Sequence, residues 1–225
     1  RRRILTKPEE IIFNENISKE DLKKFQEFVF KYHDNELSKL ACPTLEKKLN
    51  IPFYLYSKYY IKMYALDTPF VTDMKMFLSN GYKSIYQIYF DILKLGIKEG
   101  ILTSFRDGII YRGSRINKIE YEAFEKGKQY YTNLMNSYSQ SEQTARDFVS
   151  YYSKKLPSDC YTAIFEVEKP KDGIFLNNVE MRHYGGSPQR EEILYLPNSC
   201  FEITNLRTSG NIKVITLKYL GVLED

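Results

Sequence analysis

The pattern of apolar residues changes near Gly108, and this change constrains the fold of the 225-residue chain more than any other feature. Before Gly108, apolar residues recur every three or four positions, as they do on one face of a helix. After it come short runs rich in β-branched and aromatic residues, which are typical of strands. Helices first and strands afterwards, without regular alternation of the two, favour an α+β fold over a doubly wound sheet.

Four helices are predicted before that point, at about residues 18–32, 56–66, 69–78 and 82–95. The last has the clearest amphipathic stripe in the chain, formed by Ile85, Ile88, Tyr89, Ile92 and Leu95. A helix with one apolar face needs a partner that covers it. We therefore expect a helical part over residues 1–100, packed on a β-rich core over residues 101–225 to form one structural unit.

Seven strands and one strong helix are predicted in the second half. The strands are expected at 108–112, 129–138, 161–167, 173–176, 192–196, 200–206 and 212–219. The helix is expected from about Ser139 to Lys154, because Pro157 follows and would stop it.

Composition and motifs exclude several classes of function. The net charge of +4 is mild and the basic residues are interspersed with acidic ones, so nucleic acid is not the expected partner. No apolar stretch is long enough to span a bilayer. Cys42, Cys160 and Cys200 are scattered without a CxxC pair, and His33 and His183 are the only histidines. Zinc sites, disulfide frameworks and histidine-dependent triads therefore lack their signatures, as do Rossmann, P-loop and HExxH motifs.

The first candidate site element is a predicted strand that ends in Arg112 and Gly113. The planar guanidinium of an arginine can bind a phosphate with two hydrogen bonds, and a glycine lets a ligand approach the backbone closely. The same two residues are also explained, without any ligand, as an exposed arginine followed by a glycine in a turn. This element therefore indicates a phosphate site only in combination with others.

The second element is Asn136–Ser139, at the start of the predicted helix. Ser139 and Glu142 have the spacing of a capping box, so a helix cap explains Ser139 as well as any functional role. Ser137 lies before that cap. Its hydroxyl could meet a ligand or orient a neighbouring carboxylate.

The third element is the loop 181–190, rich in Gly and Pro, which leads into Glu191 and Glu192 at the start of an apolar strand. Because side chains alternate along a strand, one of these carboxylates must point to the side that the neighbouring apolar residues bury. A carboxylate at the mouth of a cleft and a solvated edge strand both fit this pattern.

In this order and at these spacings, the three elements resemble the Arg-Ser-Glu class of ADP-ribosyltransferases, which includes vertebrate arginine-specific ecto-enzymes and many bacterial toxins and effectors. The matching residues are Tyr111, Arg112 and Gly113, then Ser137, Tyr138, Ser139, Ala145 and Phe148, then Glu192, Ile193, Leu194, Pro197 and Phe201. The resemblance covers about residues 56–222.

The resemblance implies a fold of two small, roughly perpendicular sheets that form a cleft for NAD, with helices on one side. It also implies NAD+ as co-substrate, no metal, and a role for each motif residue. Arg112 would hold the phosphate and ribose part of NAD, Gly113 would offer its backbone to the nicotinamide amide, and Ser137 would position Glu192. Glu192 would accept a hydrogen bond from the 2′-hydroxyl of the nicotinamide ribose. Further NAD contacts are expected at Ser114, Tyr138 and Ser139.

The sequence departs from the family at two positions. Tyr138 replaces the Thr of the Ser-Thr-Ser motif, which we expect to change the stacking around the nicotinamide. Arg190 stands where arginine-modifying members carry Glu and some others carry Gln. Acceptor recognition is expected at Tyr184, Gln189, Arg190 and Glu191. A cationic Arg190 disfavours an incoming guanidinium, whereas a local bulge could bring Glu191 or Gln189 into its place.

The sequence thus predicts a mono-ADP-ribosyltransferase that modifies a protein, with Glu192, Arg112 and Ser137 as the catalytic residues. Two alternatives stay open: an NAD+ glycohydrolase, and an NAD-binding module that has lost turnover. We expect a monomer. The abundance of Lys, Asn and Tyr, without structural disulfides, suggests a secreted bacterial effector that acts in the host cytoplasm.

Overall fold

The structure, a computed structural model, describes residues 85–98, 100, 102, 104–105, 107–132, 134–176 and 192–223. The predicted helices at 18–32, 56–66 and 69–78 lie outside the described residues, as do Tyr184, Gln189, Arg190 and Glu191. The chain divides into two compact units, one of Arg1–Leu102 with Val179–Pro188 and one of Thr103–Asn178 with Gln189–Asp225. How the helical part packs on the β-rich part stays a prediction.

Helix α5 (Ile85–Lys98) is the described element of the first unit, and it confirms the helix predicted from the amphipathic stripe. Phe90 and Leu93 on this helix are buried. Lys98 lies in the last turn, where a positive charge interacts favourably with the helix dipole. Gly100 follows with a φ of +70°, and its N–H donates to the carbonyl of Ile97. This left-handed glycine ends the helix three residues later than predicted.

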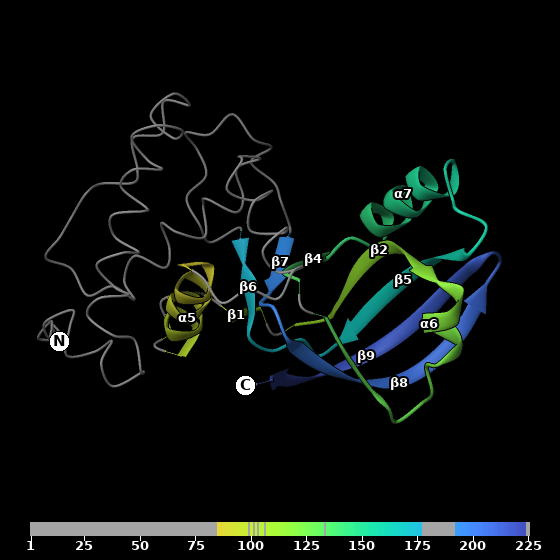
Figure 1. The fold of residues 1–225 in the computed structure, drawn as a ribbon. Helices are drawn as coiled ribbons and strands as arrows, with labels where there is room; N and C mark the ends of the chain where they lie inside the picture. The colour runs from red at the N-terminus through yellow and green to blue at the C-terminus, as the bar shows by residue number, and fades with distance from the viewer. Residues whose placement is uncertain are drawn as a thin grey trace, which may run out of the picture. The chain divides into compact units, whose positions relative to one another are not determined.

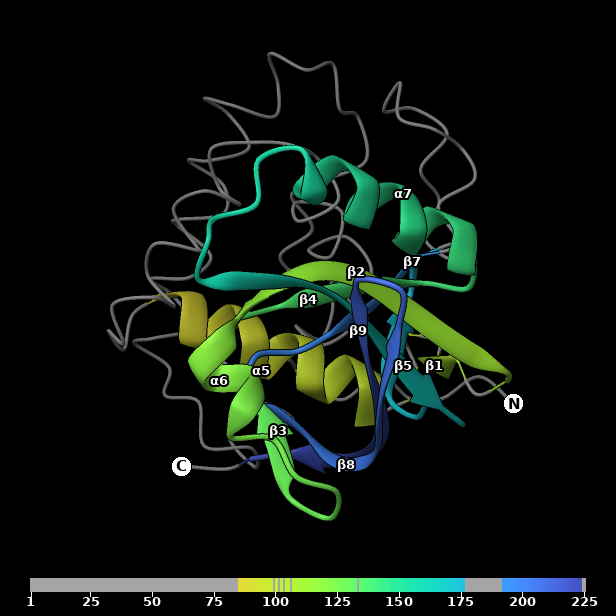
Figure 2. The same cartoon turned by 90° about the vertical axis from the view of Figure 1, so that its right-hand side faces the viewer.

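The described residues of the second unit form a nine-stranded sheet with two helices (Figures 1 and 2). Its strands are β1 (Ser104–Phe105), β2 (Ile109–Asn117), β3 (Gln129–Tyr131), β4 (Asn136–Ser139), β5 (Cys160–Glu168), β6 (Gly173–Phe175), β7 (Glu192–Tyr195), β8 (Ser199–Ser209) and β9 (Ile212–Val222). Its helices are α6 (Lys118–Glu122) and α7 (Glu142–Ser153). The strand order is β1-β6-β7-β4-β2-β5-β9-β8-β3, and the β5–β9 pair is the parallel one.

The hydrogen-bonded pairing within the sheet is shortest between β4 and β2. These two strands pair at one position, Tyr111 opposite Ser139, whereas the other neighbouring strands pair over two or more positions. In Figure 1, β6 and β7 run steeply and β5 and β9 run diagonally. The prediction of two small, roughly perpendicular sheets is not confirmed in that form. Hydrogen bonds join two groups of strands into one sheet, and the single paired position allows β2 and β4 to diverge.

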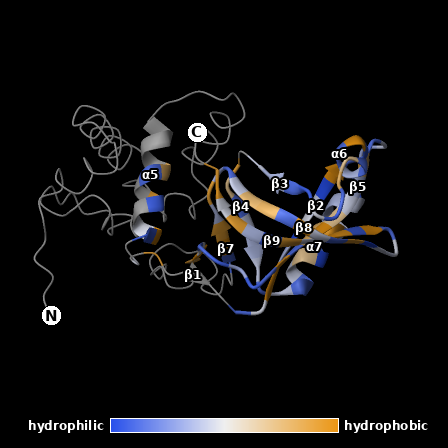
Figure 3. Cartoon of the chain, turned by 90° about the horizontal axis from the view of Figure 1, so that it is seen from below, coloured by the Kyte–Doolittle hydropathy of each residue, from blue (hydrophilic) through white to orange (hydrophobic). Residues whose placement is uncertain are grey.

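The core lies on one face of this sheet. A cluster of buried apolar residues there comes from β2, β4, β5, β7, β8 and β9, among them Ile110, Phe165, Ile193, Phe201 and Leu217. Figure 3 shows the apolar residues running along the strands. Helix α7 covers the other face across β2 and buries Ala145 and Val149 (Figures 1 and 2). Strand β5 is therefore buried on both faces, which explains its nearly continuous apolar run.

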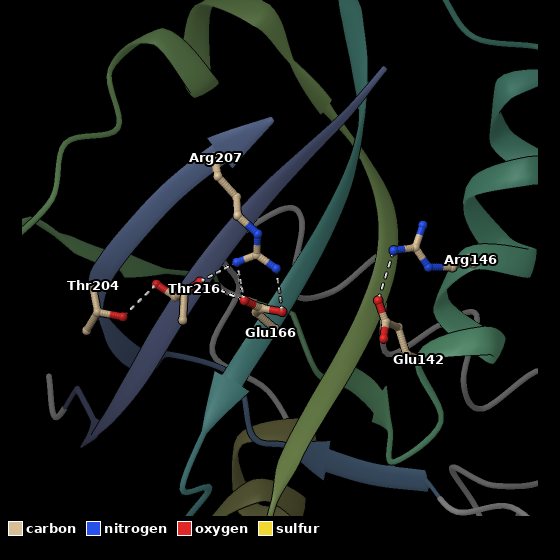
Figure 4. A network of polar contacts seen from close by, with 6 residues as sticks. All are labelled: Glu142, Arg146, Glu166, Thr204, Arg207 and Thr216. Carbon is tan, nitrogen blue, oxygen red and sulfur yellow. Dashed lines mark hydrogen bonds and ion pairs between the residues drawn. The ribbon is translucent and has the colours of Figure 1, made fainter. Parts of the chain in front are cut away.

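An ion pair between the buried Glu166 and the half-exposed Arg207 joins β5 and β8 on the α7 side of the sheet, and Thr216 of β9 also donates to Glu166 (Figure 4). Glu166 accepts hydrogen bonds from Arg207 Nη1 at 2.6 Å, from Arg207 Nη2 at 3.3 Å and from Thr216 Oγ1 at 2.8 Å. Burial by itself raises the pKa of Glu166, but the hydrogen bonds from Arg207 and Thr216 outweigh it and hold this pKa below its usual value. The Glu166 side chain is 11% exposed, and its carboxylate accepts from these donors.

Strand β1 was not predicted, and residues 118–122 and 129–138 also differ from the prediction. Residues 129–138 form two strands rather than one, because a turn in which Thr132 Oγ1 accepts from the N–H of Leu134 separates β3 from β4. Strand β3 pairs with β8 at a sheet edge, while β4 lies between β7 and β2. Helix α6 was not predicted. It begins after Asn117, whose side chain accepts from the N–H of Ile119 at 2.9 Å, so the asparagine was the available signal.

Candidate active site

Arg112 was predicted at the end of a strand. The structure places it inside the sheet, because β2 continues to Asn117. The strand pairs with β5 over nine positions, from Ile109 opposite Glu168 to Asn117 opposite Cys160. Arg112 is half-buried, and its Nη1 donates to the main-chain carbonyl of Ser137 at 3.1 Å. Its side chain therefore ties β2 to β4 near the position where these strands diverge.

Gly113 allows α7 to pack directly against β2. A Cβ atom built on Gly113 would overlap the carbonyl oxygen of Ala145 and lie 2.9 Å from the Cβ of Phe148. The absence of a side chain is thus explained by helix packing, a reason that the sequence did not reveal. The predicted contact between the Gly113 backbone and the nicotinamide amide stays a prediction.

Strands β4 and β7 bring Ser137 and Glu192 together. Ser139 lies opposite Glu192 and Ser137 lies opposite Leu194, so the two serines and Glu192 share one face of the pair. Ser137 Oγ donates to Glu192 Oε1 at 2.7 Å across the diagonal. Glu192 is half-buried. It is therefore the carboxylate that turns toward the serines.

The capping-box spacing suggested Ser139 as the cap of α7. The structure shows that Ser141 is the cap. Ser141 Oγ accepts from the N–H of Thr144 at 3.3 Å, and Ser139 Oγ accepts from the N–H of Ser141 at 3.0 Å. The pairing of Ser139 with Glu192 keeps Ser139 in the strand, which delays the start of the helix. Both serines had cap chemistry, and only the strand pairing decided between them.

Tyr138 points away from Ser137 and Ser139 and into the core. It is 3% exposed, and its ring meets that of Tyr195 edge-on, with centroids 5.5 Å apart and planes at 89°. Burial raises the pKa of its hydroxyl, so the phenol stays neutral. The ring thus lies in the core, while the residue also borders the pocket described next, and its expected effect on the stacking around a nicotinamide stays a prediction.

A pocket of about 420 Å³ lies where β2 and β4 diverge. Its wall is formed by Tyr111, Arg112 and Gly113 of β2, Ser137, Tyr138 and Ser139 of β4, Thr144, Ala145, Phe148 and Tyr152 of α7, and Glu192 of β7. Of these, Arg112 and Glu192 carry charge, and Phe148 is an aromatic surface that is 52% exposed. Three segments that are far apart in the sequence therefore converge on one cavity.

Two features of this wall differ from the sequence prediction. Ser114 is not part of it: β2 continues beyond Gly113, Ser114 pairs with Ala163 of β5, and its hydroxyl donates to the carbonyl of Arg115. Thr144 and Tyr152 are part of it and were missed. They lie four residues before and after Phe148, so the helical spacing around Ala145 and Phe148 could have revealed them.

Among the described residues, no group of three or more His, Cys, Asp and Glu side chains could hold a metal ion. The expectation of metal-free chemistry stays a prediction. No helix within the described ranges is long and apolar enough to cross a membrane.

Protein-family models give no match to the sequence, and neither do curated protein sequences. Solved structures do match. The Vis toxin from Vibrio splendidus, an ADP-ribosyltransferase, has a TM-score of 0.56 and 16% identity over 91% of this chain and 87% of Vis. The chain has the fold of an ADP-ribosyltransferase. Exoenzyme S from Pseudomonas aeruginosa has a TM-score of 0.54 and 13% identity over 87% of each chain. The type III effector XopAI from Xanthomonas axonopodis pv. citri has a TM-score of 0.54 and 12% identity over 91% of this chain and 89% of XopAI.

These likenesses confirm the predicted ADP-ribosyltransferase-like α+β fold. At such identities they establish the fold alone, because one fold can carry different functions. The activity must therefore be argued from the pocket.

Proposed function

We propose that this chain is a mono-ADP-ribosyltransferase that takes ADP-ribose from NAD+, places it on a protein side chain and releases nicotinamide. The observation that carries the proposal is the 2.7 Å hydrogen bond from Ser137 to Glu192, in a pocket that Arg112 also lines. The likeness in fold to Vis and to exoenzyme S, whose structure is bound to carba-NAD, supports the choice of NAD+.

Arg112 is suited to the diphosphate of NAD+. A guanidinium has five N–H donors in a planar fork, and one nitrogen of Arg112 is used on the Ser137 carbonyl. The remaining donors can bind phosphate oxygens with charge assistance. The half-exposed ring of Phe148 offers a flat apolar surface to an aromatic ring of the dinucleotide.

Glu192 is suited to the bond that breaks. When the bond between C1′ of the ribose and the pyridinium nitrogen breaks, its electron pair neutralises the nicotinamide and leaves an oxocarbenium-like sugar. A fixed carboxylate beside that sugar stabilises the developing positive charge. A nucleophile of the acceptor then bonds to C1′ and loses its proton. Because nicotinamide departs from a cation, no general acid is required, in agreement with a described pocket wall that contains no histidine.

The acceptor is a separate part of the proposal. The residues expected to recognise it, Tyr184, Gln189, Arg190 and Glu191, lie outside the described residues. Vis has been solved with agmatine, a guanidinium compound, which makes an arginine acceptor worth testing in this fold. The positive charge of Arg190 favours a second candidate function, in which water is the acceptor and NAD+ is hydrolysed.

The decisive experiment measures nicotinamide release from NAD+ together with transfer of labelled ADP-ribose to proteins of a cell lysate. We expect Glu192→Gln to lower both by about 100-fold to 1000-fold, the usual loss when one electrostatic contact to a transition state is removed. Glu202→Gln is the matched control, since Glu202 is also a half-buried strand glutamate but lies outside the pocket wall. Labelling that survives Glu192→Gln would remove the catalytic assignment.

The same two measurements separate the alternatives. Nicotinamide release without protein labelling indicates a glycohydrolase. Tight NAD+ binding without release indicates a binding module. Labelling of agmatine would establish a guanidinium acceptor. A secreted bacterial effector that modifies a host protein, acting as a monomer, is the biological context we propose.

A further inference from the structure

The short strand β4 carries the candidate site on one face and a buried aromatic ring on the other. Ser137 and Ser139 line the pocket, while Tyr138 is 3% exposed and is the residue with which β4 enters the main core cluster. The strand has four residues and pairs with β2 at one position. A ladder of hydrogen bonds to β2 therefore does not fix how far β4 lies from Arg112.

Tyr138 is one of four connected aromatic rings, Tyr138, Tyr195, Phe201 and Tyr219, here called the four-ring cluster; Phe201 also meets Tyr130 outside it. The Tyr138 ring lies 5.5 Å from that of Tyr195 and 6.5 Å from that of Phe201. Tyr219 lies 5.1 Å from Tyr195 and 5.6 Å from Phe201, at the other end of the cluster. The rings come from β4, β7, β8 and β9, so the four-ring cluster connects β4 to the strand that carries Glu192.

The functional contacts depend on where β4 lies. Ser137 Oγ is 2.7 Å from Glu192 Oε1, and the Ser137 carbonyl is 3.1 Å from Arg112 Nη1. Hydrogen bonds weaken steeply beyond about 3.2 Å, so a small shift of β4 would break both contacts. A smaller side chain at position 138 would leave space beside Tyr195, and surrounding groups relax partly into such a space.

We propose that Tyr138 is a positioning residue: β4 pairs with β7 over four positions, and the Tyr138 ring anchors this short pair in the core so that Ser137 stays within hydrogen-bonding distance of Glu192. The inference rests on the proposed function. It explains why a large residue can stand at a position where the family carries threonine: the ring fills the core, and the serines on either side keep their direction toward the pocket.

The first experiment compares three single variants by nicotinamide release, with melting temperatures measured for each. Tyr138→Phe keeps the ring, and we expect kcat within about twofold of wild type; Tyr138→Leu should lower kcat by about tenfold with little change in KM for NAD+. Tyr219→Leu removes a ring from the same cluster that does not contact Tyr138. It should lower the melting temperature and leave kcat unchanged. A Tyr138→Leu enzyme with normal kcat, or with a raised KM alone, overturns the proposal.

A double-mutant cycle tests whether Tyr138 acts through Ser137. If it does, adding Tyr138→Leu to Ser137→Ala should cost much less than the tenfold that it costs in the wild-type background. Losses that simply multiply overturn the proposal. Tyr138→Met replaces the leucine variant if that variant does not fold.

Failure of the proposed function can be recognised separately. If the wild-type chain releases no nicotinamide, the function is wrong, and the positioning role is then decided by crystal structures of wild type and Tyr138→Leu. The proposal expects the distance from Ser137 Oγ to Glu192 Oε1 to lengthen beyond about 3.5 Å in the variant. An unchanged distance overturns it.

Discussion

Replacing Ser137 by alanine tests the contact on which the candidate site depends. The hydrogen bond from Ser137 Oγ to Glu192 Oε1 is 2.7 Å long, the length typical of a hydroxyl donating to an ionised carboxylate. Hydrogen bonds to charged groups contribute about 1.5–3 kcal/mol, and partial exposure places this one near the lower end, at about 1.5–2 kcal/mol. Because about 1.4 kcal/mol corresponds to a factor of ten, we expect kcat to fall by about 10-fold to 30-fold.

The assay is the initial rate of nicotinamide release over a range of NAD+ concentrations. Ser199→Ala is the matched control, because its hydroxyl also makes a 2.7 Å hydrogen bond, to the carbonyl of Leu196, and is buried. That variant should lose stability and keep kcat. Unchanged kcat in Ser137→Ala would refute the link between Ser137 and Glu192. A rise in KM alone would show that the hydroxyl contacts NAD+ instead, and equal losses in both variants would indicate a general loss of structure.

Two further predictions concern stability. Gly113→Ala would push a Cβ into the carbonyl of Ala145, so we expect a loss of about 1–3 kcal/mol in the free energy of unfolding, measured in urea; unchanged stability would show that α7 does not pack this closely. Glu166 has a folded pKa below its ordinary value of 4.5, so its stabilising contribution is present above that value and is lost as pH falls through the folded pKa. Wild type should therefore exceed Glu166→Gln by about 1–3 kcal/mol near neutral pH, since Arg207 is half-exposed, and the difference should shrink below about pH 4.5. A difference independent of pH would contradict this reading of the ion pair.

The strands were predictable because their apolar and aromatic residues alternate or run together in short stretches. The runs at 161–167 and 212–219 became β5 and β9, with no end shifted by more than three residues. The stretch 129–138 was not predictable as two strands. Its composition is strand-like throughout, and the division at Thr132 depends on where β3 and β4 find their partners.

The candidate site was predictable in its residues more than in its geometry. Arg112, Ser137 and Glu192 stood out from their order and spacing, and the structure brings them to one pocket. Ser114 does not line the pocket: β2 continues past Gly113 and pairs Ser114 with Ala163 of β5. The true cap at Ser141 also escaped detection, since two serines offered the same local chemistry.

The sequence by itself determined which segments become strands and which side chains share a face within each of them, because these properties depend on neighbours a few residues away. The tertiary structure alone decided that Ser137 meets Glu192, that Gly113 makes room for α7, and that Tyr138 fills the core. The first two contacts join residues that are 25 to 55 positions apart, and the third depends on which face of β4 turns toward the core. All of them exist only after β4 pairs with β7 and α7 packs over β2. Local periodicity carries no information about which distant strand becomes the neighbour.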